Sequence, residues 1–340
     1  MIQAVAHEYD LPLRHVFSIS RESTSVQPTL VVELTDGVRR GYGEATTNKY
    51  YNATRERMRA SLDKARPVLA AVDRLDPERL WPELAAAIGD DSFTLCAVDQ
   101  AAYDLWGKQQ GQPVYKLWGL SNERVPLSNY TIGIDTIEKM VAKLNEMPDW
   151  PIYKIKLGTP HDLEIVRELR KHTDAVFRVD ANCGWGVEEA IRNSRELRPL
   201  RVEFIEQPLP AEDVEGSRRV YAESALPIVA DESCISEADV SRCQGRFHGV
   251  NVKLVKCGGL TPARRMIAEA RSLGMKTMVG CMTESTVGIS AIAQLLPLLD
   301  FVDMDGAALL ARDVATGCRV DRGRCRYPDA PGHGVELLTK

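Results

Sequence analysis

Three carboxylate residues are spaced along the sequence so that one metal ion could bind them all. Asp180, Glu206 and Asp231 each follow an apolar run and lie 26 and 25 residues apart, about one strand–helix unit. The C-terminal ends of barrel strands meet at one face, so the three side chains are expected to converge. Without a cation they would repel and raise one another's pKa, whereas Mg²⁺ prefers oxygen ligands. The alternative is three separate carboxylates that pair with arginines or cap helices.

Three lysines are placed to move a proton beside these carboxylates. Lys154 and Lys156, in "YKIKLG" (153–158), share one face of a predicted strand, and Lys253, in "NVKLVK", lies on a strand beyond the trio. Lys156 and Lys253 would then face each other across the metal, which stabilises an ene-diolate when a substrate α-proton leaves. A general base works best with a pKa of roughly 7 to 8, and Lys154 would lower that of Lys156. Alternatively, the lysines form salt bridges with the carboxylates.

Alternating strand-like and helix-like segments follow residue 112 and are suited to positioning these groups. Eight such strands at a period of roughly 20 to 28 residues predict parallel βαβ units that close into a TIM-like barrel. A doubly wound open sheet is the alternative, but the sequence has no GxGxxG turn. The predicted strands are 125–134, 153–157, 176–181, 202–207, 227–232, 249–255, 276–281 and 301–306.

The first 112 residues have a different pattern. The segment "TLVVELTDGVRRGYGEA" predicts a hairpin with its turn at Asp36–Gly37. Residues 52–111 are rich in Ala, Leu, Arg and Glu and predict helices, with breaks expected at Pro67, Pro77 and Gly89. This part is therefore expected to form a separate α+β unit.

The composition narrows the class of protein. A net charge of -5 gives no electrostatic reason to expect nucleic acid or an anionic membrane as a partner, and no apolar run reaches the length of a membrane span. The N-terminus does not resemble a secretory signal, so a cytoplasmic protein is expected. Eight cysteines without a CxxC pair predict free thiols, and six histidines without HxH or HExxH spacing argue against zinc.

The motifs "KIK", "DAN", "EQP", "DES" and "VNVKL", in this order and spacing, resemble the muconate-lactonizing subgroup of the enolase superfamily over nearly the whole chain. The resemblance implies an α+β capping domain (1–112), a (β/α)7β barrel (113–310) and a tail that returns to the cap (311–340). It also implies one Mg²⁺ per subunit on Asp180, Glu206 and Asp231, with Lys156 and Lys253 as acid/base lysines and Lys154 as electrostatic helper. Members are often oligomeric, so a homo-oligomer is expected.

The last predicted strand selects among activities of that subgroup. "DMDGAALL" resembles the DxD strand of dipeptide epimerases, in which two aspartates, here Asp303 and Asp305, hold the substrate's α-ammonium group. "GCMTES" (280–285) also resembles that group, so Met282, Glu284 and Thr131 are further substrate-binding candidates. The two aspartates could instead pair locally. An acidic pair would repel the dianionic substrate of a cycloisomerase.

We therefore expect a Mg²⁺-dependent isomerase that inverts the C-terminal residue of a dipeptide by Lys/Lys proton transfer. The alternatives are an N-acylamino acid racemase, an o-succinylbenzoate synthase or a muconate-type cycloisomerase. A non-catalytic binding barrel would need no opposed lysines. In the Ala-Glu epimerases a cap arginine recognises glutamate, and "FSISREST" offers Arg21, although Glu22 beside it favours a cationic or neutral side chain.

Overall fold

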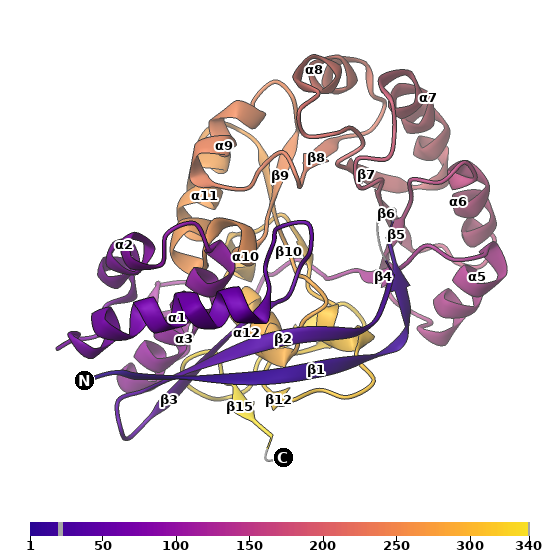
Figure 1. Cartoon of the computed structure of the whole chain (residues 1–340). Coiled ribbons are helices and arrows are strands. Elements are labelled where there is room, and N and C mark those ends of the chain that lie inside the picture. The colour runs from indigo at the N-terminus through magenta and orange to yellow at the C-terminus, as the bar shows by residue number, and fades with distance from the viewer. Residues whose placement is uncertain (20–22, 339–340) are drawn as a thin grey trace.

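The computed structural model describes residues 1–19 and 23–338, and its central element is a barrel of eight parallel strands (Figure 1). Each strand pairs with its neighbours in chain order, and a parallel bridge between Ser128 and Val302 joins the two ends of the sheet. All eight predicted strands are present, which excludes the open sheet. They are β4 (Tyr130–Ile132), β5 (Ile152–Lys156), β6 (Val176–Asp180), β7 (Val202–Glu206), β8 (Ile228–Ala230), β9 (Gly249–Val252), β10 (Lys276–Gly280) and β11 (Phe301–Asp303).

Helices on the outside of the barrel connect these strands, so the predicted (β/α)7β architecture is confirmed (Figure 1). Because both faces of each strand are covered, even the lysine-bearing β5 is buried along its whole length. Its outward side chain Tyr153 packs edge-on against Phe177 of the next strand. The helices are α5 (Ile137–Glu146), α6 (Asp162–Arg170), α7 (Val187–Leu197), α8 (Val214–Glu223), α9 (Glu237–Cys243), α10 (Leu254–Cys257), α11 (Leu260–Ser272) and α12 (Thr286–Ala293).

The N-terminal unit combines an antiparallel sheet with helices. Strands β2 (Ser23–Thr35) and β3 (Arg40–Thr46) form the predicted hairpin. The long β1 (Gln3–Ser18) was not predicted, because its polar residues break the alternation and its pairing register shifts after Pro12. The helices are α1 (Arg55–Ala70), α2 (Pro77–Ile88), α3 (Ser92–Gln110) and α4 (Val114–Leu117). The break expected at Pro67 is wrong: α1 loses one intrahelical donor there but continues to Ala70, where burial of Leu69 supports the last turn.

Close backbone packing holds this unit together internally, and polar contacts fix it as a cap on the barrel. Gly41 and Gly43 of β3 lie so near α3 that a Cβ atom would come within 2.3 Å of Leu105 N and 2.1 Å of Ala97 O. The buried Glu44, on the same strand, accepts hydrogen bonds from Ser285 N and Oγ at 3.1 and 2.5 Å. These contacts hold the cap against the N-terminal end of α12, beside the barrel mouth.

The residues after the barrel run back to the cap. Ala311 N donates to Pro12 O at 2.8 Å, and His333 N donates to Asp104 Oδ1 at 2.6 Å. The short strands here are β12 (Ala315–Thr316), β13 (Arg319–Asp321), β14 (Arg324–Arg326) and β15 (Glu336–Leu337). We propose the boundaries at residues 112 and 310 as the division between cap, barrel and tail.

Two further observations concern the chain as a whole. All eight cysteines are free thiols. Across residues 1–19 and 23–338, no helix has both the length and the apolar character needed to cross a membrane.

Candidate active site

The three predicted carboxylates meet at the C-terminal ends of adjacent barrel strands. Asp180 ends β6, Glu206 ends β7 and Asp231 follows β8, and one oxygen of each lies within 4.8 Å of the others. All three are buried. Glu206 Oε2 accepts no aligned hydrogen bond from any described residue, although Lys154 Nζ lies 2.8 Å away. Converging hard oxygens with a buried, incompletely satisfied member are a donor set that fits Mg²⁺.

The predicted lysines lie on both sides of this trio. Lys156 Nζ, on β5, is 2.7 Å from Asp180 Oδ2, and Lys253 Nζ, after β9, is 2.8 Å from Asp231 Oδ2. Lys154 is more deeply buried, and its Nζ lies 2.8 to 3.1 Å from carboxylate oxygens of Asp180, Glu206 and Asp303. Lys156 and Lys253 therefore form the salt bridges weighed as the alternative, with two different members of the trio, and their opposition across a metal stays a prediction.

These ion pairs govern the electrostatics of the site. Burial raises the pKa of Glu206 to about 7, and Asp180 acts in the same direction. Burial acts likewise on Asp180 and Asp231, but the lysines outweigh it and hold the pKa of both below its ordinary value. The expectation that every carboxylate pKa would be raised is thus wrong for these two. For Lys154, burial acts to lower the pKa, yet the surrounding carboxylates raise it; its effect on Lys156 stays a prediction.

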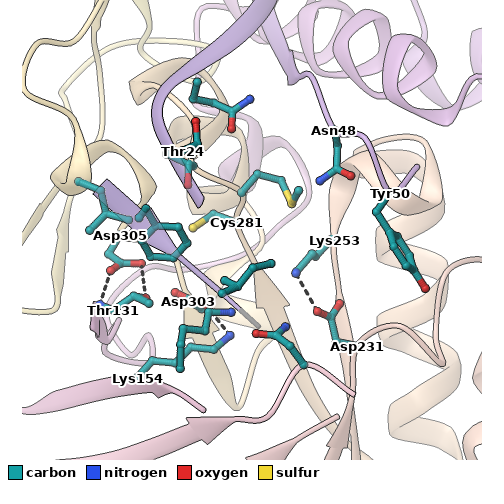
Figure 2. Close-up of a pocket in the computed structure, with 18 of the residues that line it drawn as sticks. Thr24, Asn48, Tyr50, Thr131, Lys154, Asp231, Lys253, Cys281, Asp303 and Asp305 are labelled. Carbon is teal, nitrogen blue, oxygen red and sulfur yellow. Dashed lines mark hydrogen bonds and ion pairs between the residues drawn. The ribbon is translucent and has the colours of Figure 1, made fainter. Parts of the chain in front are cut away.

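A second acidic group lies across the cavity, as Figure 2 shows. Asp303 Oδ2 is 2.9 Å from Lys154 Nζ, and Asp305 accepts from Thr131 N at 2.6 Å and from Thr131 Oγ1 at 3.2 Å. Burial and the adjacent Asp303 raise the pKa of Asp305. Both carboxylates line the cavity. A positively charged group of a substrate in the cavity would therefore find carboxylate oxygens to pair with here.

One cavity, whose space including its opening is about 980 Å³, joins the two groups. Lys154, Lys156, Asp231, Lys253, Thr131 and Met282 line it, as predicted, together with the two aspartates. Asp180, Glu206 and Glu284 do not line it; the Glu284 carboxylate is buried and accepts from Met282 N at 3.0 Å. Arg21 lies outside the described residues. The sequence-based reasoning missed the part of the wall that comes from the cap: Phe17, Ile19, Thr24, Gln27, Asn48, Tyr50 and Tyr51.

Two residues behind the trio were also missed. Asn251 Nδ2 donates to Glu206 Oε1 at 2.8 Å, and Lys256 Nζ donates to Asp231 Oδ1 at 2.7 Å. The signal for Lys256 was its place in the same short segment as Lys253, which precedes the one-turn helix α10 that contains Lys256. Asn251 lies on β9 two residues before Lys253, and the same-face rule that linked Lys154 with Lys156 also places it beside Lys253.

Two protein-family models together match most of the chain. Residues 1–119 match the model of the mandelate racemase / muconate lactonizing enzyme N-terminal domain, and residues 136–340 match that of the enolase C-terminal domain-like family.

Individual relatives agree with these family matches. An L-Ala-D/L-amino acid epimerase of Flavobacterium johnsoniae is 56% identical over 99% of this chain and 100% of its own. An L-Ala-D/L-Glu epimerase of Bacteroides thetaiotaomicron is 38% identical over 96% and 86%. The crystal structure of a dipeptide epimerase from Cytophaga hutchinsonii, complexed with Mg and the dipeptide D-Ala-L-Val, superposes with a TM-score of 0.93 at 26% identity, covering 99% and 96%. These matches confirm the resemblance and the expected enzyme class, an isomerase.

Proposed function

The chain belongs to the mandelate racemase / muconate lactonizing enzyme family, and from this premise we propose that it is a Mg²⁺-dependent dipeptide epimerase. It inverts the α-carbon of the C-terminal residue by proton transfer between Lys156 and Lys253. The observation that carries this proposal is the strand order: β6, β7 and β8, which supply the carboxylate trio, lie between the strands that supply the two lysines.

The carboxylates supply the metal site of this proposal. Asp180, Glu206 and Asp231 would hold Mg²⁺, as their burial and mutual approach favour. When bound, the ion acts as a Lewis acid that stabilises negative charge on the substrate's carboxylate. The trio is buried among barrel side chains, so water is excluded and charge stabilisation is stronger there than in solution.

The two lysines supply the acid/base step. Lys156 pairs with the first carboxylate of the trio and Lys253 with the last, so their ammonium groups approach the site from opposite sides. A Cα atom held between them loses its proton to one lysine and receives a proton from the other on the opposite face, which inverts its configuration. Positioned proton transfer of this kind contributes roughly 10²- to 10⁴-fold to the rate.

Asp303 and Asp305 support a substrate with a free ammonium group. They line the same cavity, and their carboxylates are placed to neutralise a cation at the far end of a short substrate. N-acylated substrates and dicarboxylates bring no cation to this position. Because the described cap residues that line the cavity are uncharged, we propose a C-terminal residue with an uncharged side chain.

Screening a library of L-Ala-X and X-Ala dipeptides in D₂O with Mg²⁺ tests the proposal. Proton NMR should show exchange of the α-proton of the C-terminal residue in members with an uncharged side chain. Exchange with N-succinylamino acids but with no dipeptide would reject it. We further propose that the protein is a cytoplasmic homo-oligomer. Sedimentation of the purified protein tests its oligomeric state.

A further inference from the structure

Each carboxylate of the trio has one oxygen engaged by a protein donor, and for Glu206 and Asp231 that donor belongs to a residue that does not line the cavity. The opposite oxygen of each, Asp180 Oδ2, Glu206 Oε2 and Asp231 Oδ2, instead faces the catalytic lysines at 2.7 to 2.8 Å. The engaged oxygens and their donors are Asp180 Oδ1 with Asn182 N at 2.9 Å, Glu206 Oε1 with Asn251 Nδ2 at 2.8 Å, and Asp231 Oδ1 with Lys256 Nζ at 2.7 Å.

Lys256 holds its carboxylate with a fully committed ammonium group. Its side chain has no solvent exposure, and besides Asp231 Oδ1 it donates to the backbone oxygens of Asp231 and, at 2.9 Å, of Cys234. The backbone oxygen of Asn251 is a fourth, more distant acceptor at 3.4 Å, so all three protons of the ammonium group are committed to protein oxygens. Lys253, by contrast, lines the cavity and contacts the other oxygen of the same carboxylate (Figure 2). One lysine thus faces the substrate and the other faces the protein interior.

We propose that Lys256 and Asn251 are positioning residues that limit Asp231 and Glu206, respectively, to one metal-facing oxygen each and thereby favour Mg²⁺ over larger cations. This inference rests on the proposed Mg²⁺ site. Mg²⁺ requires near-octahedral coordination and keeps several waters, whereas Ca²⁺ takes six to eight oxygens and accepts bidentate carboxylates. A carboxylate whose second oxygen is already engaged can offer a cation only one. The held oxygens therefore disfavour the ligand number that Ca²⁺ prefers.

The ratio of the affinities for Ca²⁺ and Mg²⁺ distinguishes a positioning role of Lys256 from a contribution to stability alone. Replacing Lys256 with methionine removes a positive charge, which changes the affinity for Mg²⁺ and for Ca²⁺ in the same direction because both are divalent. It also frees Asp231 Oδ1 for bidentate binding, which strengthens Ca²⁺ relative to Mg²⁺. A loss of stability alone would leave the ratio of the two dissociation constants unchanged.

The experiment titrates MgCl₂ and CaCl₂ separately into metal-free protein by isothermal titration calorimetry. In Lys256→Met the dissociation constant for Ca²⁺, divided by that for Mg²⁺, should fall by on the order of tenfold relative to wild type, the usual size of an effect from a group behind a metal ligand. Lys108→Met is the matched control. Lys108 Nζ is also held by a carboxylate and by backbone oxygens, of Arg40 and Val335, but at the junction of cap and tail. In Lys108→Met the ratio of the two dissociation constants should equal that of wild type.

Asn251→Ala provides a second measurement if Lys256→Met does not fold. It frees Glu206 Oε1 without changing the charge, and the ratio should fall in the same direction. A ratio within twofold of wild type in the folded variants would overturn the inference and leave the proposed epimerase intact. Wild-type protein that binds no Mg²⁺ would overturn both, so the two failures are distinguishable.

Discussion

The barrel wall and the cap wall of the cavity differ in chemical character. The barrel contributes three lysines, three aspartates and one glutamate, and all but Lys154, in the middle of β5, lie at or just beyond strand ends. The cap contributes Phe17, Ile19, Thr24, Gln27, Asn48, Tyr50 and Tyr51, which are aromatic, apolar or neutral. Strand ends that are packed on both faces are rigid, so they suit charged side chains whose positions must be fixed. Loops and the ends of the β1–β2 ribbon tolerate changes of residue type. From this difference we propose that the barrel performs the reaction and that the cap selects the side chain.

The barrel and the junction of cap and tail also differ in whether a buried ionisable side chain has a partner. In the barrel, ion pairs compensate each buried lysine with at least one carboxylate. At the junction of cap and tail, His333 is buried and neither ring nitrogen has a hydrogen-bond partner among residues 1–19 and 23–338. Changes in the barrel should therefore affect turnover, and changes at that junction should affect stability.

The largest effect is expected from Asp231→Asn. This change removes one metal-facing charge and the counter-charge of Lys253, so kcat/KM should fall by at least about 10²-fold and Mg²⁺ affinity should fall with it. Steady-state kinetics and calorimetry measure both. Asp300→Asn, at the opposite end of the barrel beside Lys276, is the control and should retain activity. Wild-type activity in Asp231→Asn would remove the barrel's assigned role.

A smaller effect concerns acid stability at the junction of cap and tail. Burial lowers the pKa of His333 from its ordinary value of 6.5 to about 3, and Lys108 acts in the same direction. The folded protein therefore favours the neutral ring. This contribution is fully present above pH 6.5 and is lost as pH falls from 6.5 toward 3.

Urea unfolding at pH 7 and pH 5 measures this loss. Between these values, wild type should lose roughly 2 kcal/mol more stability than His333→Leu, because only wild type takes up the extra proton on unfolding. Turnover at pH 7 should be equal in the two proteins. Equal losses of stability would show that His333 is not held neutral.

The smallest effect is expected from Phe17→Ala in the cap wall. Loss of an apolar contact with the substrate side chain should raise KM by about tenfold and leave kcat within a few-fold, since binding is lost equally in the ground and transition states. Val16→Ala is the matched control, because Val16 is the exposed neighbour on the same strand. A fall in kcat with unchanged KM would assign catalysis to the cap as well.

The sequence allowed the barrel site to be predicted well and the cap wall poorly, for a physical reason. Asp180, Glu206 and Asp231 follow strands of one repeating unit, so their spacing alone implies convergence. The placement of Phe17 over the barrel depends on the long ribbon of β1 and β2, whose course no local pattern encodes. Lys256 was missed although it lies in the quoted "NVKLVK", because its role depends on which oxygen of Asp231 it contacts.

The most direct test of the central claim compares Lys156→Ala with Lys253→Ala in D₂O, each supplied separately with the two epimers of one accepted dipeptide. If the lysines act on opposite faces, neither variant epimerises, and proton NMR shows α-proton exchange from one epimer in the first variant and from the other epimer in the second. Exchange of the same epimer by both variants, or epimerisation by either at the wild-type rate, would contradict the two-base account.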